Sequence, residues 1–270
     1  MSVFWIMTVI ALVFSCIGFK KYIWFISIGY GLAVAGIGAG LLVTGCRMAS
    51  GGQALSPWII FACILFIVYG IRLGGYLAVR EWKSNSYNTK MEGEVKSGED
   101  MNIAVKCAIW ISAALLYVCE TSPVLFRMIN GSGTDGVFIT GLVISVLGLV
   151  IESAADLQKN AAKKAAPGRF VDSGLYRLVR CPNYFGELLF WAGTFIGGVP
   201  VFQGSVQWAC GLIGFLGIIY VMFGGARRLE MRQDRTYGDD PEYWAYKNST
   251  PIMIPVIPLY SVKDHKWLVA

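Results

Sequence analysis

The sequence is poor in the residues that most catalytic and metal sites use. It contains one histidine, His265, close to its C-terminal end, and only 15% of its 270 residues are charged. A single histidine in that position argues against histidine-based metal or general-base chemistry. The seven cysteines show no metal-ligand spacing and lie mostly in apolar runs, so we interpret them as small core residues and predict no metal site.

Long polar stretches are scarce as well. A soluble dinucleotide-binding domain needs repeated β-α-β units, and no polar interval in this chain is long enough for them. The alternating Gly36, Gly38 and Gly40 follow no predicted strand, so they indicate close helix packing and not a dinucleotide fingerprint. Any nucleotide must therefore bind to the loops and to the inner ends of helices.

Apolar residues dominate what is present. They make up 56% of the chain, which predicts an all-α integral membrane protein with one domain of seven transmembrane helices over residues 1–270. The seven apolar segments lie at about 3–19, 22–45, 57–79, 103–127, 136–153, 184–203 and 205–224. We expect the first to be retained and not cleaved as a signal peptide. Residues 1–135 are expected to form a substrate-cavity half, and residues 136–270 a cofactor-binding half with a cytoplasmic tail.

The basic residues predict the orientation. With the N-terminus outside, the inner loops and the tail hold Lys20, Lys21, Arg80, Lys83, Lys90, Lys96, the cations from Lys159 to Arg180, and those from Arg227 to Lys266. Only Arg47 and Arg127 fall outside, which is the positive-inside asymmetry. The cytoplasmic face can then attract anionic lipid headgroups or an anionic ligand. Glu120 is expected near the outer interface as a solvated acid.

The stretch from Ile151 to Trp191 is the most informative part of the chain. Four charged residues at helical spacing share one helix face that runs from the apolar segment into the polar interval. They are Glu152, Asp156, Lys159 and Lys163. Pro167 and Gly168 should stop that helix. The turn composition of residues 172–174 could then cap a short helix that runs through Tyr176 to Arg180.

The following apolar helix carries a carboxylate near its start. Asn183 is predicted to cap this helix, whose first turns hold Glu187. A carboxylate at membrane depth is costly and is therefore a functional candidate. Arg169, Arg177, Arg180 and two helix N-termini surround this region, an arrangement suited to a pyrophosphate. The pattern predicts a phosphate-bearing ligand at the membrane face.

Tyr69 and Arg72 share one face of the third apolar segment, in the inner half of the bilayer. An arginine at that depth must face protein, a carboxylate or water. Either Arg72 forms a structural pair with Glu152 or Glu187, or it belongs to a polar floor beneath an apolar cavity. In the polar loop that follows, Tyr87 and Lys90 are further candidates to reach a nucleotide.

Several motifs resemble one known family. They are Asp156-Leu157-Gln158-Lys159, Gly168-Arg169-Phe170, Ser173-Gly174-Leu175-Tyr176, Arg180-Cys181-Pro182-Asn183-Tyr184-Phe185-Gly186-Glu187 and Trp191, followed by Glu230, Tyr243, Tyr246 and Thr250 through Pro255. Over about residues 140–256 the chain is similar to the steroid 5-alpha-reductase family, in particular its bacterial-type DUF1295 branch. Membrane methyltransferases of the isoprenylcysteine type share the Arg-x-Pro-x-Tyr-x-Gly part.

The resemblance implies a seven-helix membrane reductase that uses NADPH to saturate a carbon–carbon double bond conjugated to a ketone. Hydride delivered to the β-carbon leaves negative charge on the ketone oxygen, so the protein must place a donor there. The family's substrate tyrosine looks equivalent to Tyr69, and Arg72 would orient it or add positive charge. These two are the predicted catalytic residues. The predicted cofactor-binding residues are Glu152, Asp156, Lys163, Arg169, Tyr176, Arg180, Asn183 and Glu187.

The chain also departs from the family. Steroid-reducing members carry a Gln-Glu pair on the second helix, whereas here the nearest echo is Gln53-Ala54, and Cys181 replaces a usual histidine. The sequence therefore favours a reductase more than it favours a steroid substrate. The alternatives are an S-adenosylmethionine-dependent methyltransferase and a non-catalytic sterol- or lipid-binding protein or small transporter. Asn183 together with Glu187 favours a dinucleotide as the ligand over S-adenosylmethionine.

The expected partners follow from this hypothesis. They are a lipophilic small molecule that enters from the bilayer and the membrane lipids themselves, with no nucleic acid. The chain is expected to act as a monomer in a bacterial inner membrane or an endoplasmic reticulum, with its active site towards the cytoplasm.

Overall fold

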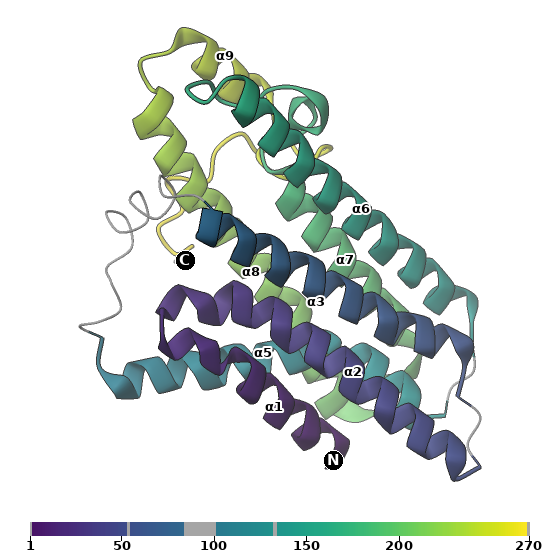
Figure 1. The fold of residues 1–270 in the computed structure, drawn as a ribbon. Coiled ribbons are helices and arrows are strands. Elements are labelled where there is room, and N and C mark those ends of the chain that lie inside the picture. The colour runs from purple at the N-terminus through teal and green to yellow at the C-terminus, as the bar shows by residue number, and fades with distance from the viewer. Residues whose placement is uncertain (1, 53–54, 84–100, 132–133, 269–270) are drawn as a thin grey trace. The chain divides into compact units, whose positions relative to one another are not determined.

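The apolar segments form helices, and the described part of the chain contains no strand. The computed structural model describes residues 2–52, 55–83, 101–131 and 134–268. The α-helices are α1 Ser2–Ser15, α2 Ile28–Ser50, α3 Pro57–Lys83, α5 Ile103–Ile129, α6 Gly136–Ala165, α7 Pro182–Gly198, α8 Gly204–Tyr237 and α9 Pro241–Ser249 (Figure 1). Short 3-10 helices are η1 Cys16–Phe19, η2 Tyr22–Ile26, η4 Gly174–Arg177 and η5 Val199–Val201.

Five of these helical stretches are long and apolar enough to cross a membrane. They are Tyr22–Ser50, Pro57–Trp82, Ile103–Ile129, Gly136–Ala165 and Gly204–Tyr237. A helix satisfies its own backbone hydrogen bonds, as lipid demands, so the prediction of a multi-pass, all-helical membrane protein is confirmed. The other two predicted segments form shorter helices, α1 with 14 residues and α7 with 17 residues.

The chain divides into two compact units. The first comprises Met1–Ile139 and Thr194–Gly214, and the second comprises Thr140–Gly193 and Phe215–Ala270. Tyr69 and Arg72 belong to the first unit, and all eight predicted cofactor residues belong to the second.

Glycines set the packing of α2 in the first unit, where it lies beside α1 and α3 (Figure 1). A Cβ atom at Gly36 or Gly40 would lie 2.6 Å or 2.5 Å from side chains of α1. One at Gly38 would lie 2.8 Å from the carbonyl oxygen of Cys63 on α3. The glycine run therefore serves close helix packing, as predicted.

The charged residues in the C-terminal half of α5 are buried. Arg127 pairs with Asp135 at 2.7 Å and donates to the carbonyl of Gly197. Glu120 is only 3% exposed, so the prediction of a solvated acid is wrong. Glu120 is buried because α8 packs closely against α5 at Gly214. A Cβ atom at Gly214 would lie 2.5 Å from the backbone nitrogen of Glu120.

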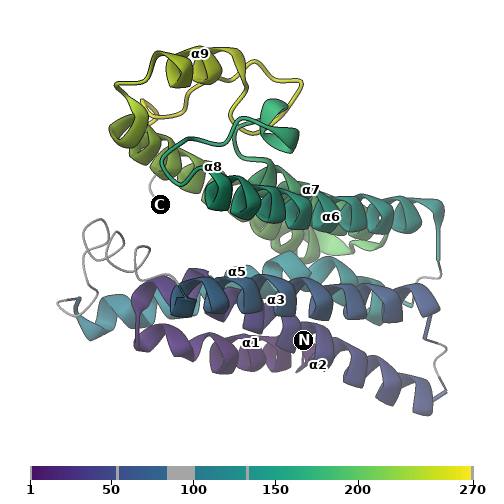
Figure 2. The same ribbon diagram turned by 45° about the horizontal axis from the view of Figure 1, so that its top comes forward.

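In the second unit α6 and α7 run antiparallel and touch along their backbones (Figures 1 and 2). Gly193 abuts Ser145, and Gly148 abuts Phe190. One turn further along, a Cβ atom at Gly186 would lie 2.6 Å from the backbone nitrogen of Glu152. The two helices can approach this closely only because small residues line the contact.

The replacement Gly186→Ala tests this contact. The added methyl group meets backbone atoms of α6 and cannot be relieved by moving a side chain, so we expect a loss of about 1–3 kcal/mol of stability. Gly75→Ala on α3 is the matched control, because nothing lies within 4 Å of its Cβ position. The apparent melting temperature in detergent should fall for the first variant and not for the second; equal values would contradict the packing.

Candidate functional site

Three carboxylates are buried on the α6 and α7 pair. Glu152, Asp156 and Glu187 are 2%, 8% and 6% exposed. The antiparallel register places Glu152 opposite Gly186, the residue before Glu187. The next turn of α6 carries Asp156, and the first turn of α7 carries Asn183. The tertiary structure therefore brings these four predicted residues to one end of one helix pair.

Asn183 does not cap α7. The helix begins at Pro182, and Asn183 lies inside its first turn. Proline is favoured at the first helical position, because its fixed φ angle suits the helix and its missing N–H is not needed there. This places Asn183 and Glu187 one helical turn apart on the same face.

The loop after α6 packs on α6 through backbone contacts. The helix ends at Ala165, before Pro167 and Gly168, as predicted. The predicted short helix is the 3-10 turn η4, which ends at Arg177 and receives no cap from the Ser173 side chain. Gly174 has a φ of 62°, which favours glycine, and the Gln158 side chain accepts from the Leu175 N–H at 2.8 Å.

Tyr176 is buried between α6 and α9. Its hydroxyl donates to the carbonyl of Ala155 at 3.3 Å, and its own carbonyl accepts from the Tyr246 hydroxyl at 2.7 Å. Burial is the main cause that raises the pKa of Tyr246 far above its ordinary value. Tyr246 therefore stays protonated and keeps α9 attached to the loop.

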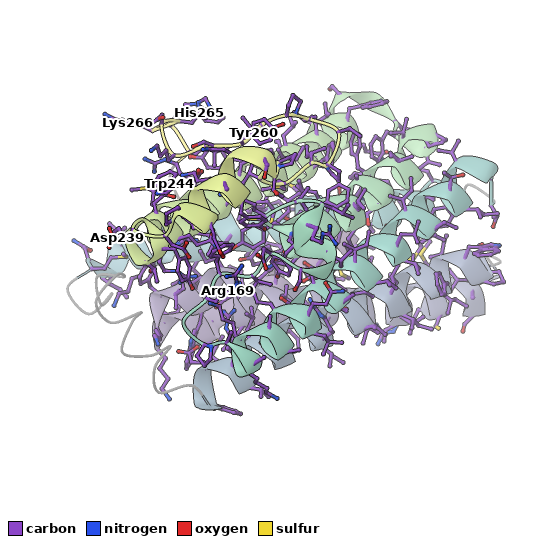
Figure 3. All side chains as sticks on the ribbon, turned by 90° about the horizontal axis from the view of Figure 1, so that it is seen from above. Arg169, Asp239, Trp244, Tyr260, His265 and Lys266 are labelled. Atoms are coloured by element: carbon purple, nitrogen blue, oxygen red, sulfur yellow. The ribbon has the colours of Figure 1, made fainter. Side chains whose placement is uncertain are left out.

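Lys163 and Arg169 lie at the rim of the unit. Lys163 donates to the Tyr237 hydroxyl at 2.7 Å and to the carbonyl of Arg169. The Arg169 guanidinium pairs with Glu242 at 2.7 Å and Asp172 at 2.9 Å, and these hydrogen bonds raise its pKa. Figure 3 looks onto this end, where Arg169 lies beside α9.

Arg180 belongs to a buried network of four charges. Its guanidinium lies 3.4 Å from Glu230 and donates to the carbonyl of Tyr260. Lys247 contacts Glu230 at 3.0 Å and Asp234 at 2.7 Å. This network, which we call the charge cluster (Arg180, Glu230, Asp234 and Lys247), was not predicted from the sequence. The spacing of Glu230 and Asp234, one turn apart beyond the apolar run of α8, was the available signal.

Two nitrogens of Arg180 can each donate a further hydrogen bond. Its side chain is 1% exposed, yet Nε and Nη1 find no hydrogen-bond acceptor among the described residues. A buried donor without an acceptor is costly, so such a group calls for an explanation by strain, water or a ligand. An anionic ligand oxygen would satisfy it.

Lys247→Met should destabilise the protein strongly. It leaves Glu230 and Asp234 with one cation fewer in a buried site, and breaking a buried pair costs about 3–5 kcal/mol. Lys21→Met is the control, because its pair with Glu81 is more exposed and should cost about 1 kcal/mol or less. Urea or thermal unfolding in detergent measures both variants. Similar losses of stability in the two variants would show that the charge cluster contributes no more than the exposed ion pair.

Tyr69 lies in a cluster of tyrosines in the first unit. It is fully buried and donates to the Tyr30 hydroxyl at 3.2 Å. The Tyr30 ring lies 4.8 Å from that of Tyr117, whose hydroxyl donates to the carbonyl of Phe25 at 2.7 Å. Arg72 is half-buried and lies over the Tyr76 ring at 5.7 Å. Tyr30 was not predicted, because a single tyrosine in a glycine-rich segment carries no pattern.

These features define an all-helical multi-pass membrane protein with three buried carboxylates on one helix pair. The chain belongs to the DUF1295 family, described as a protein of unknown function, whose profile matches residues 29–250. The resemblance to this family is thus confirmed. Three further candidates from the sequence, Gln53-Ala54, Tyr87 and Lys90, lie outside the described residues.

Two curated relatives match part of the chain. A stretch of 58 residues is 41% identical to a protein named steroid 5-alpha-reductase DET2 from Gossypium hirsutum, and 38% identical to its namesake from Arabidopsis thaliana. Each match covers 21% of this chain and 22% of the relative. No solved structure matches the chain.

Proposed function

We propose that this protein is an NADPH-dependent membrane reductase that saturates the carbon–carbon double bond of a lipophilic enone. The observation that carries the proposal is the set of Glu152, Asp156, Asn183 and Glu187 at one end of the α6 and α7 pair. The partial similarity to the two plant steroid 5-alpha-reductases supports the same activity.

The residues of the second unit suit a dinucleotide. An amide and a carboxylate one turn apart, Asn183 and Glu187, can accept from and donate to the carboxamide of a nicotinamide. Lys163, Arg169 and Arg180 supply positive charge for phosphates, and Arg180 has two donors without acceptors among the described residues. Bound NADPH would supply a hydride.

The protein's own contribution to the reaction is to bind and stabilise developing charge. Hydride addition to the β-carbon moves an electron pair onto the ketone oxygen, where a hydrogen-bond donor lowers the barrier. We assign this role to the Tyr69 hydroxyl, with Arg72 as the residue that orients it. The apolar surroundings of Tyr69 would exclude water and strengthen that hydrogen bond.

The proposal includes a finer topology. We propose seven membrane crossings, in which the shorter helices α1 and α7 also span, with the N-terminus outside and the site towards the cytoplasm. The distribution of lysines and arginines supports this orientation. A lipophilic substrate would then enter from the bilayer into a monomeric enzyme, in a bacterial inner membrane or an endoplasmic reticulum.

A methyltransferase that uses S-adenosylmethionine is the second candidate, because the segment from Arg180 to Gly186 matches that family too. Its shared positions have structural roles here. Gly186 admits α6, and Tyr184 lies 3.4 Å from the Cβ position of Gly225 on α8. Residues that pack helices are compatible with either reaction, so this match does not favour the methyltransferase.

Thermal unfolding with different ligands tests the class of cofactor. NADPH at 100 times its dissociation constant should add about 2.7 kcal/mol of stability by mass action, and S-adenosylmethionine should add none. Glu187→Gln should reduce the NADPH effect, because a hydrogen bond to a charged group contributes roughly 1.5–3 kcal/mol. Asp264→Asn in the exposed tail is the control. Stabilisation by S-adenosylmethionine alone would overturn the proposal.

Tyr69→Phe tests the donor. We expect turnover of an enone to fall by roughly 10²–10³, as for the loss of one oxyanion donor, with little change in NADPH affinity. Tyr117→Phe removes a hydroxyl from the same cluster, but this hydroxyl bonds a backbone carbonyl, so turnover should persist. The measurement is the single-turnover rate of NADPH oxidation. Equal rates for Tyr69→Phe and the unaltered protein would reject the assignment.

A further inference from the structure

The C-terminal segment from Tyr260 to Leu268 returns along α8. Arg227 donates to the carbonyl of Lys263 at 2.9 Å, and its second nitrogen lies 3.4 Å from the carbonyl of Leu268. The Tyr220 hydroxyl donates to the carbonyl of Trp267 at 3.0 Å. Three hydrogen bonds therefore fix the end of the tail against this helix.

The position of these contacts on α8 gives their depth. Residues 204–226 contain no charged side chain, and Arg227 and Arg228 follow directly. Tyr220 lies about 10 Å before Arg227 along the helix axis, on the apolar side. Trp267 thus lies beside the end of the apolar run, and Lys263 beside the first cations. For a spanning helix, this is the level at which the bilayer meets water.

The surface at this level combines an exposed apolar side chain with cations. Trp267 is 65% exposed. Lys263, Lys266 and Arg228 are exposed as well, and Asp264 is the acid among them. Figure 3 labels Tyr260, His265 and Lys266 along this part of the tail. We call the set Arg228, Lys263, Lys266 and Trp267 the tail surface.

The tail surface is held in place before any lipid binds. The Val262 N–H donates to Glu230 at 2.9 Å, and the carbonyl of Tyr260 accepts from Arg180. Both partners belong to the buried charge cluster. A preorganised surface loses little conformational entropy on binding, which favours association.

We propose that the tail surface binds the anionic headgroups of the surrounding bilayer. Trp267 enters the boundary between headgroups and acyl chains, as tryptophan does at membrane interfaces, while Lys263, Lys266 and Arg228 contact lipid phosphates. The net charge of three cations against Asp264 selects anionic lipids over zwitterionic ones. The partner is thus a lipid surface and not a soluble anion.

Tryptophan quenching by brominated lipids tests this proposal. The full chain is reconstituted into phosphatidylcholine bilayers that contain a fixed minority of phosphatidylglycerol. The bromine atoms are placed either on the phosphatidylglycerol or on the same amount of phosphatidylcholine. We expect stronger quenching from brominated phosphatidylglycerol, and Trp267→Phe should remove most of the excess. Trp5→Phe is the control: this residue of α1 is 57% exposed, and its loss should reduce quenching by both lipids equally.

Charge variants test the selection. The double variant Lys263→Gln, Lys266→Gln should lower the excess quenching by brominated phosphatidylglycerol by half or more. High salt should do the same, because it screens exposed charges. Lys164→Gln with Arg235→Gln removes the same charge from exposed positions outside the tail surface and should leave the excess unchanged. An excess that persists in Trp267→Phe or in the Lys263 and Lys266 variant would overturn the proposal. Equal quenching by the two brominated lipids would overturn it too.

Discussion

Every charge that this chain buries has to be balanced close by, because removing an ion from water costs several kcal/mol. The charge cluster meets this constraint in the second unit: two cations, Arg180 and Lys247, balance two anions, Glu230 and Asp234. Its members come from α8, α9 and the loop before α7, and the tail joins through Val262. The constraint therefore joins four parts of the chain that the bilayer would not hold together. The position of the Arg180 loop depends on this pairing.

Glycine contacts do the corresponding work within the membrane. Lipid tails are as apolar as leucine side chains, so helices associate there through close contact and not through hydrophobic burial. Gly148, Gly186 and Gly193 let α6 and α7 meet backbone to backbone, which fixes their register. This register, which the hydrogen bond from the Ser145 hydroxyl to the Phe190 carbonyl at 2.8 Å also supports, aligns Glu152 and Asp156 with the first turns of α7. A carboxylate-rich site at one helix pair is then a consequence of small residues one or two turns away.

The sequence predicted the helical elements well and some of their details poorly. Apolar runs, the stop at Pro167 and Gly168, and the packing role of the glycines are local patterns, and the structure agrees with them. Asn183 was misplaced as a cap because Pro182 can itself begin a helix. Glu120 was misjudged because its burial depends on Gly214, which is far away in the chain. The partners of Tyr69 and Arg180 were missed for the same reason, since Tyr30 and Glu230 are distant in sequence.

The sequence by itself determined that this protein is helical and crosses the membrane, because the length and polarity of each segment decide those properties locally. It also singled out the residues from Ile151 to Trp191 as a candidate site. Only the tertiary structure decided which side chains contact one another. Pairing of Arg180 with Glu230, of Lys247 with Asp234, and of Trp267 with Tyr220 depends on how α8 and the tail fold back. Contacts between distant positions arise from helix packing, which no local pattern in a single sequence specifies.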